Sequence, residues 1–415
     1  MNPAPSASFR RVIAAEVVSN FGSMMSRLAI PWLAVLALGA TPWQMGLLAV
    51  ADVLAGATAA IGIGVLVDRW PKRAAMVAAD VARAALLVGL ALAAAGQQLS
   101  FGLLWAAAAA GGVLTMAFEL ARSAWMACAA ERQDLSARNA QLAAGTAISE
   151  AVAFGITGAL FQWAGGVMAL LLDAASYLAS ALLLRRVDEV RNPAATSASS
   201  PSAPPDAGIS LREALAFVAG DAQLRTLALL EGLVAAGMGI AGTSYMIYVT
   251  RDLGLPTAIL GLVFAVGGIG SALGAALAPR LGRRIGGGRA LAWGLALATL
   301  GNLFAPLAAG AGLIAIALLV AQQLVGDAGQ VAYAVHDRTL RQTLAPPAAL
   351  ARVDAVLRGL GQAAGVAAAL AGGWFATAHG ARNGLWLAAG FFGIATGVAW
   401  LAWRGDDQSS SRAIV

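Results

Sequence analysis

Residues 64–73 read Gly64-Val-Leu-Val-Asp68-Arg69-Trp-Pro71-Lys72-Arg73, a polar segment between two long apolar runs. The segment is too charged to lie in lipid, so it predicts a loop between two membrane-spanning helices. Asp68 is unfavourable at the end of its own helix, because the last carbonyl groups there already carry partial negative charge. We therefore expect Asp68 to interact with a group outside that helix. The basic residues suit the helix end, and Pro71 disfavours helical geometry in the residue before it.

The composition indicates an integral membrane protein. The chain has 415 residues, of which 60% are hydrophobic and 12% charged, and its mean hydropathy is +0.76. So few charged residues cannot cover a water-soluble protein with this much apolar surface. Long unbroken runs rich in Ala, Leu and Gly favour spanning helices over a β-barrel, whose strands alternate apolar and polar residues. The predicted fold class is therefore all-α.

The lengths of the apolar runs predict the number of spans. Residues 290–326 carry no charged side chain, and one helix of that length would be far longer than the ~30 Å hydrocarbon core. We therefore expect a hairpin of two spans, broken at Pro306, Gly310 and Gly312. The same reasoning divides residues 83–119 near residues 96–100. The twelve predicted spans are 12–38, 43–67, 74–96, 101–122, 138–162, 166–186, 223–250, 257–281, 288–309, 312–340, 351–377 and 381–403.

The basic residues predict the orientation of these spans. With both termini in the cytoplasm, only Arg251 and Arg382 of the 27 Lys and Arg residues lie in outward loops, as the positive-inside rule requires. Residues 191–208 are rich in Pro, Ser and Ala, which is typical of a linker. We therefore expect a six-helix bundle over residues 1–186, a cytoplasmic linker over 187–222, a second six-helix bundle over 223–403 and a cytoplasmic tail over 404–415.

Several functions are disfavoured by the same composition. The net charge of +6 belongs to cytoplasmic loops and not to one basic face, so no nucleic-acid partner is expected. Cys128 is the only cysteine, which excludes an intramolecular disulfide and a thiolate metal cluster, and His336 and His379 form no zinc motif. We expect no metal site, no cofactor and no enzymatic activity. The expected state is a monomer in the lipid bilayer.

The segment 64–73 resembles the loop motif between helices 2 and 3 of the major facilitator superfamily, Gly-x-Leu-Ala-Asp-Arg-x-Gly-Arg-Lys-Arg. The matching residues are Gly64, Leu66, Asp68, Arg69, Lys72 and Arg73, whereas Pro71 replaces the usual glycine. Gly64 would let another backbone approach closely. The resemblance implies two six-helix halves with the substrate site between them near the midplane. We expect Asp68 to cap the N-terminus of the eleventh span, near residues 351–353.

A partial copy of this motif occupies residues 275–284, between the eighth and ninth spans. Its basic end is formed by Arg280, Gly282, Arg283 and Arg284. Pro279 stands where the first copy has Asp68, so the repeat is asymmetric. This second copy supports an origin of the two halves by duplication.

Charged residues inside the spans are the candidates for the substrate or proton pathway, because an ionisable group in the membrane is costly and is usually functional. These residues are Arg27, Asp52, Glu150, Glu231 and Asp327. Arg27 and Asp52 fall at about the same depth on adjacent antiparallel helices. We expect them to form an ion pair, which either serves transport or only holds the two helices together. Asp80 and Arg83 lie three residues apart on one helix face, so we expect a local salt bridge.

Further stretches resemble the twelve-helix drug and siderophore exporters, a subfamily that includes macrolide efflux proteins and the enterobactin exporter. They are Asn20-Phe-Gly22, Ala29-Ile-Pro31-Trp32, Asp173-Ala-Ala-Ser176-Tyr177, and Arg341-Gln342 followed by Ala351-Arg352-Val353. This resemblance implies proton-driven export of an amphipathic small molecule, such as an antibiotic, a siderophore or a secondary metabolite, by alternating access across a bacterial inner membrane. An importer or a lipid transporter on the same fold is the alternative. A membrane sensor without transport activity is a more remote one.

Overall fold

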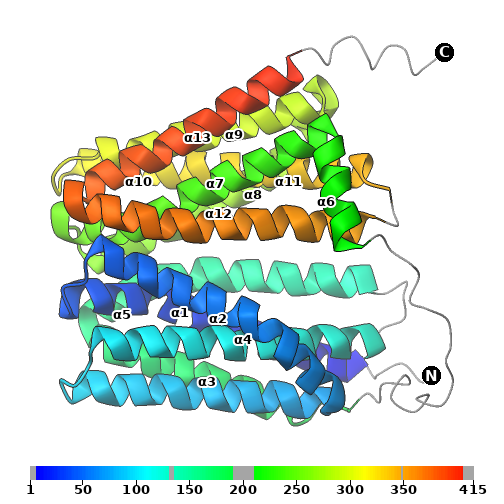
Figure 1. The fold of residues 1–415 in the computed structure, drawn as a ribbon. Helices are drawn as coiled ribbons and strands as arrows, with labels where there is room; N and C mark the ends of the chain where they lie inside the picture. Colours follow the sequence, from blue (N-terminus) through cyan, green and yellow to red (C-terminus); the bar gives the residue numbers. More distant parts are fainter. Residues whose placement is uncertain (1–5, 130–134, 190–209, 347–348, 405–415) are drawn as a thin grey trace, which may run out of the picture. The chain divides into compact units, whose positions relative to one another are not determined.

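A computed structural model describes residues 6–129, 135–189, 210–346 and 349–404 of the chain. Every regular element in these residues is a helix (Figure 1). Within this part of the chain, ten helical segments are long and apolar enough to cross a membrane. The predicted linker residues 191–208 lie outside the described residues. The structure divides into two compact units, which are treated separately below: unit 1 comprises residues 1–40, 47–202 and 256–265, and unit 2 the remainder.

Unit 1 is built from long helices that run alongside one another (Figure 1). They are α1 (Ser6–Trp32), which continues into the π-helical turn η1 (Leu33–Ala37), α2 (Pro42–Arg69, from residue 47 onward), α3 (Lys72–Ala95), α4 (Phe101–Ala129), α5 (Leu135–Leu184) and the start of α8 (Thr257–Ile285, up to residue 265). Helix α5 consists of two arms, because Gly165 has φ 76° and ψ 172°, which interrupts the helix. Glycine adopts this positive φ without the steric penalty of a side chain. The break falls between the predicted fifth and sixth spans.

Aromatic packing closes one end of unit 1. Phe9 of α1 and Trp125 of α4 meet edge to face, with ring centroids 5.2 Å apart. Met76 of α3 and Leu184 of α5 are buried in the same hydrophobic cluster. The indole N–H of Trp125 donates to the carbonyl oxygen of Asp188 at 3.1 Å, which satisfies its polar atom. The ends of α1, α3, α4 and α5 are therefore tied together.

Unit 2 holds the second set of helices. They are α6 (Leu211–Gly220), α7 (Ala222–Ile247), the π-helical turn η3 (Tyr248–Asp252), α8 (Thr257–Ile285, from residue 266 onward), α9 (Gly287–Leu307), α10 (Leu313–Ala321), the π-helical turn η4 (Gln322–Gly326), α11 (Asp327–Leu344), α12 (Leu350–His379) and α13 (Ala381–Trp403). The hairpin predicted in residues 290–326 is confirmed. It turns between α9 and α10, where Gly310 has a φ of 70°.

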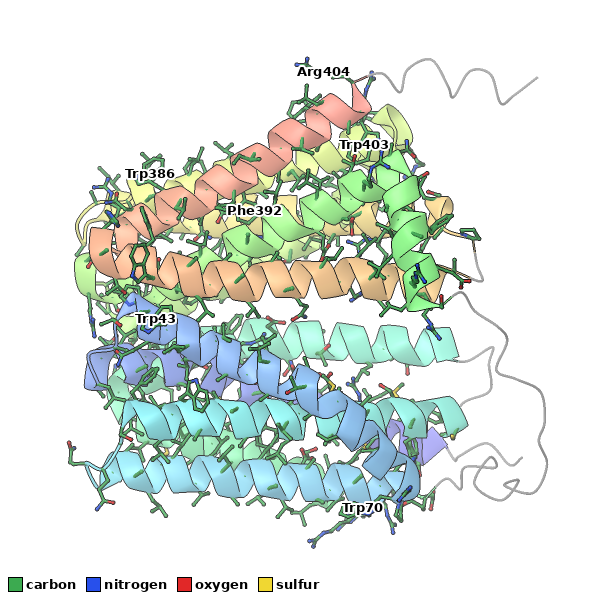
Figure 2. The ribbon with its side chains drawn as sticks, in the orientation of Figure 1. Trp43, Trp70, Trp386, Phe392, Trp403 and Arg404 are labelled. Atoms are coloured by element: carbon green, nitrogen blue, oxygen red, sulfur yellow. The ribbon has the colours of Figure 1, made fainter. Side chains whose placement is uncertain are left out.

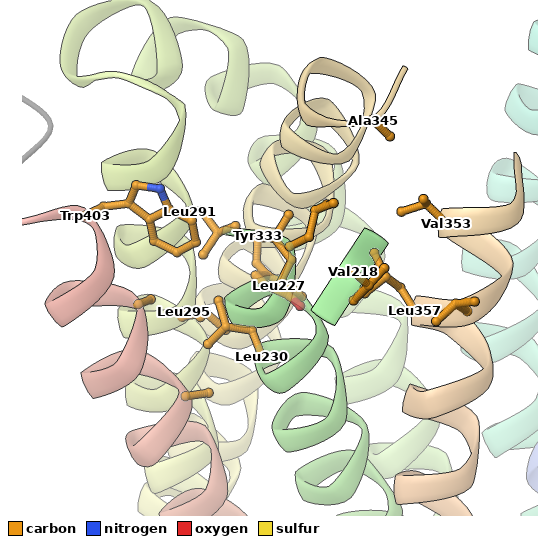
Figure 3. Close-up of a cluster of buried hydrophobic side chains, with 14 of the residues drawn as sticks. Val218, Leu227, Leu230, Leu291, Leu295, Tyr333, Ala345, Val353, Leu357 and Trp403 are labelled. Atoms are coloured by element: carbon orange, nitrogen blue, oxygen red, sulfur yellow. The ribbon is translucent and has the colours of Figure 1, made fainter. Parts of the chain in front are cut away.

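Large apolar side chains from several helices form the core of unit 2 (Figure 3). Leu227 and Leu230 of α7 pack with Leu295 of α9 and Leu357 of α12, and all four are fully buried. Trp403, the last residue of α13, is 2% exposed and joins the same cluster. The cluster fixes the positions of α7, α9, α12 and α13 around the polar groups of α11.

Helix α6 lies inside the segment predicted as a linker, residues 187–222. It begins with a capping box: Ser210 Oγ accepts the backbone N–H of Glu213 at 3.2 Å, and the Glu213 carboxylate accepts the backbone N–H of Ser210 at 2.5 Å. Ala214 and Val218 are buried on one face, while Leu211 remains 57% exposed. The segment predicted as a linker therefore includes a short helix over residues 211–220.

Candidate functional site

Residues 64–73 comprise the last turns of α2, the turn at residues 70–71 and the first residues of α3. Helix α2 ends at Arg69 and α3 begins at Lys72, and the half-exposed Trp70 lies between them (Figure 2). Lys72 is buried, and its Nζ donates to the carbonyl oxygen of Val67 in the last turn of α2. This contact places a positive charge at the negative end of the helix dipole. The side chain of Asp68 lies outside the described residues, so its capping of the eleventh span stays a prediction.

Arg73 and Gly64 complete the first motif. Arg73 Nη1 donates to the carbonyl oxygen of Val187 at 3.2 Å, and its Nε lies 3.5 Å from Oε2 of Glu189. The motif is thus attached to the chain that follows α5. A Cβ atom added at Gly64 would meet nothing within 4 Å. Among the described residues, no backbone therefore approaches Gly64 as closely as predicted.

The second motif lies at the end of α8. A Cβ atom at Gly282 would lie 2.6 Å from Cε1 of His336 on α11, so the glycine lets the imidazole pack against α8. Arg280 donates to the carbonyl oxygen of Ala276 at 3.1 Å within its own helix. Arg283 and Arg284 are exposed at the end of α8, where their charges suit the helix dipole.

Arg27 and Asp52 lie close enough to interact electrostatically, but among the described residues they are not within salt-bridge distance. Arg27 Nη1 lies 3.8 Å from Sδ of Met24 on its own helix. The Asp52 carboxylate instead lies against α4, because a Cβ atom at Gly112 would be 2.9 Å from Oδ1 of Asp52. The prediction rested on depth alone, and depth along a helix does not determine the direction in which a side chain points.

The remaining candidates differ in their surroundings. Glu150 is half-buried in the first arm of α5 and has no hydrogen-bond or ion-pair partner among the described residues. Asp327 follows directly after η4 and begins α11. Its carboxylate lies against Gly267 of α8, where a Cβ atom would collide with Oδ2 of Asp327 and lie 3.0 Å from Nε2 of Gln323. The missing side chain at Gly267 therefore leaves room for these polar groups.

Four polar residues meet around this position, and we call them the Asp327 cluster: Tyr245, Gln322, Gln323 and Asp327. The Tyr245 hydroxyl on α7 donates to Oε1 of Gln322 at 3.0 Å. Tyr245 also lies close enough to Asp327 for electrostatic interaction. Two members lie in the π-helical turn η4, a rare geometry that occurs frequently at functional sites. The cluster combines phenol, amide and carboxylate groups on the membrane-spanning helices of unit 2.

Glu231 belongs to an ion-pair network centred on Arg341 of α11. The buried Arg341 guanidinium contacts the Glu231 carboxylate of α7, lies 2.7 Å from Asp337 of its own helix and 3.2 Å from Asp354 of α12. Asp354 is also paired with Arg358 at 2.7 Å. Arg341 thus connects three helices of unit 2. The sequence analysis treated Glu231 as a pathway residue and missed its partner.

Unit 1 contains a matching pair. Arg122 of α4 forms a salt bridge with Glu16 of α1. Among the predicted spans, these helices are the first and fourth of the first half, and α7 and α11 include the first and fourth of the second. Both pairs therefore join an acid on the first span to an arginine on the fourth. Each half of the sequence has an acid early in its first span and an arginine at the end of its fourth. This repeated pattern could have been used to predict the two ion pairs.

The predicted salt bridge between Asp80 and Arg83 is confirmed, and both side chains are buried. The Arg83 guanidinium also lies over two aromatic rings, 4.5 Å from the centroid of Phe118 and 4.3 Å from that of Tyr177. Cation–π contacts of this kind stabilise a desolvated guanidinium. Arg83 therefore joins α3, α4 and the second arm of α5.

The chain belongs to the Major Facilitator Superfamily, whose pattern matches residues 12–335. It is accordingly a multi-pass membrane protein of a transporter family. Among solved structures it is similar to a bacterial metal transporter, with 18% identity, a TM-score of 0.69, and coverage of 96% of this chain and 98% of that one. A bacterial homologue of the human lysosomal transporter Spinster has 16% identity and a TM-score of 0.73, covering 96% and 97%.

The nucleoside transporter NupG is similar at 13% identity and a TM-score of 0.73, covering 97% of this chain and 99% of that chain. Among curated protein sequences, none matches this chain. At these identities the structural likenesses show the fold alone.

Proposed function

We propose that the chain is a proton-coupled exporter that moves an amphipathic small molecule by alternating access. The proposed topology has twelve spans with both termini in the cytoplasm of a bacterial cell and the spans in its inner membrane. Helix α1 with η1 and the two arms of α5 bring the ten apolar segments to twelve when each is counted as a span. The stretches that resemble drug and siderophore exporters support this direction of transport.

The Asp327 cluster is the observation that carries the proposal. It presents one carboxylate, two amides and one phenol within helices that are otherwise largely apolar. Small-molecule sites are commonly apolar cavities with a few placed polar groups. Met238 lies on α7, the helix that carries Tyr245, and adds a polarisable thioether. Its Sδ lies 3.0 Å from Nε2 of Gln330. Such groups suit an organic molecule with both polar and apolar parts.

The functional groups of the Asp327 cluster also indicate whether the transported substrate is a metal ion or an organic molecule. Solved structures with this fold include a metal transporter and a nucleoside transporter. Among the described residues, no group of three His, Cys, Asp or Glu side chains is arranged so that it could hold a metal ion. Amide and phenol groups donate and accept hydrogen bonds, which organic cargo provides in return. The cluster therefore favours organic cargo.

Proton coupling requires a carboxyl group that changes its protonation within the membrane. We assign this role to Asp327 and Glu150. An amide at either position keeps the size of the side chain but cannot exchange a proton. An importer or a lipid transporter would use the same groups with a different direction or cargo.

The test is a substrate screen in an efflux-deficient bacterium, scoring resistance to toxic compounds and release of siderophore. For a compound that responds, inverted vesicles with an imposed proton gradient report coupling. We expect Asp327→Asn and Glu150→Gln to reduce substrate-dependent proton movement, whereas Glu213→Gln on the exposed α6 serves as the control. Net accumulation of the compound would indicate an importer. Proton movement unchanged in the double variant Asp327→Asn/Glu150→Gln would overturn the assigned carriers.

A further inference from the structure

Among the described residues of unit 1, two carboxyl groups are fully buried close to one cation, Arg83. Asp80 of α3 and Asp173 on the second arm of α5 are 0% and 1% exposed. Arg83 pairs directly with Asp80. Among the described residues, no basic group lies within salt-bridging distance of Asp173, and Arg83 is the cation that interacts with it over a longer range. An ionised carboxylate buried without a partner is so unfavourable that the group takes up a proton instead.

The hydrogen bonds around Asp173 indicate the same protonation state. The single hydroxyl hydrogen of Ser176 is directed to the carbonyl oxygen of Asp173 at 2.8 Å. Ser176 Oγ also lies 3.3 Å from Oδ1 of Asp173. Because that one hydrogen is directed to the carbonyl oxygen in the shorter bond, the longer contact from Ser176 Oγ to Oδ1 does little to stabilise an ionised carboxylate, and Oγ keeps lone pairs that can accept a proton from a neutral carboxyl group. The geometry therefore agrees with a neutral Asp173.

The other groups that face Asp173 come from α1, α3 and α5. Ser26 of α1 lies beside the carboxyl group without hydrogen-bonding geometry. Tyr177 of α5 is the other titratable neighbour, and its hydroxyl lies 2.8 Å from Oγ of Ser23 on α1. Asp80 and Arg83 are the charged groups on α3, and Glu16 of α1 interacts with this pair. The backbone of α1 lies against the carboxyl group at Gly22, where a Cβ atom would be 2.5 Å from Oδ1 of Asp173.

We infer that Asp173 is a second proton-binding site of the transporter, located in unit 1. In the described arrangement it holds a proton. During the cycle the O–H bond breaks, the proton leaves to water and the electron pair stays on the carboxylate. Arg83, the cation that interacts with Asp173, then partly balances the new negative charge. This inference deepens the proposed function and depends on it for the step that links the proton to transport. Occupancy of the site by a proton does not depend on it.

Infrared spectroscopy of the purified protein at neutral pH tests the occupancy. We expect a protonated carboxyl band in the wild type that is lost in Asp173→Asn. Asp80→Asn should weaken the same band, because Arg83 is then free to pair with Asp173 and to hold it ionised. Ser176→Ala should shift the band to higher frequency, since the carboxyl group loses a hydrogen-bond partner. Asp354→Asn, at a half-buried and ion-paired carboxylate of unit 2, is the control that leaves the band in place.

The role in transport is tested in proteoliposomes with a compound identified by the screen. We expect Asp173→Asn to move fewer protons per molecule of compound than the wild type. If the wild type moves the compound without protons, the proposed coupling fails while the infrared result still stands. If the wild type is coupled and Asp173→Asn has the same proton ratio, the proton on Asp173 is static and the inference is overturned. An unchanged infrared band in Asp173→Asn would also overturn it.

Discussion

Gly22 shows how the absence of one methyl group determines packing in unit 1. A Cβ atom there would collide with Ser176 Oγ and lie 2.5 Å from Oδ1 of Asp173. We expect Gly22→Ala to lower the free energy of unfolding by about 1 to 3 kcal/mol, since overpacking outweighs the better helix propensity of alanine. Gly64→Ala is the matched control, because its position is open. Thermal unfolding in detergent measures both, and an equal response would refute the packing argument.

Arg341 allows a second prediction at the scale of single residues. Its removal leaves Glu231, Asp337 and Asp354 without their shared cation. We expect Arg341→Gln to destabilise the protein by about 3 to 5 kcal/mol. Arg358→Gln should change stability by less than about 1 kcal/mol, since this side chain is 59% exposed. A chemical unfolding series compares the two variants, and similar losses would show that burial does not govern the network.

The candidate site was only partly predictable from single residues. The sequence identifies charged residues in the spans, and local spacing predicts the Asp80–Arg83 salt bridge that the structure contains. Ion pairs between side chains of different helices were harder to predict, because the sequence does not show how each helix is rotated about its axis. Arg27 was therefore predicted to lie closer to Asp52 than the structure has it, and the contact between Arg341 and Glu231 was missed. The same limitation hid the environment of Asp173.

Helix α6 gives a prediction at the scale of the element. Hydrogen bonds from the backbone and side chain of Ser210 lower the pKa of the exposed Glu213 carboxyl group below its usual value. A lowered pKa in the folded state means that the cap stabilises α6 above the ordinary glutamate pKa of about 4.3 and that this contribution is lost as the pH falls through the lower folded value. We expect the α6 backbone to become less protected in that acidic range.

Hydrogen exchange of α6, corrected for the intrinsic pH dependence, measures this effect. Glu213→Gln should remove the acid-dependent change, and Ser210→Ala should weaken α6 by about 1 kcal/mol at neutral pH. Protection of α6 that follows the same pH curve in the wild type and in Glu213→Gln would contradict the capping argument.

Long helices were predictable for a clear physical reason. A span must be apolar over the thickness of the bilayer, so charge-free runs and Pro or Gly breaks locate it. The predicted span 381–403 coincides with α13 (Ala381–Trp403), and Gly165 separates the arms of α5 where two spans were expected. Helix α6 was missed because it is short and lies beside a Pro-rich stretch. Its capping-box residues, Ser210 and Glu213, were the available signal.

At the scale of the whole molecule, each of the two units contains an ion pair that joins the same two helices. Glu16 and Arg122 join the first and fourth predicted spans of the first half, and Glu231 and Arg341 join the corresponding spans of the second. The surroundings differ, since Arg341 has two further carboxylate partners. The fold has therefore kept the connection between the same two helices while its local charge has diverged, as the two unequal copies of the loop motif also show.

This duplication leads to a prediction about cooperation between the two ion pairs. Arg122 and Arg341 share no salt-bridge partner among the described residues. Stability changes of sites without common partners usually add to within about 0.5 kcal/mol. We expect the loss in the double variant Arg122→Gln/Arg341→Gln to equal the sum of the single losses, whereas Glu231→Gln/Arg341→Gln should lose less than its sum because both changes remove one contact. Chemical unfolding of the three single and two double variants decides this. A strong deviation from additivity in the Arg122 and Arg341 pair would show that the two ion pairs act as one unit in stabilising the folded transporter.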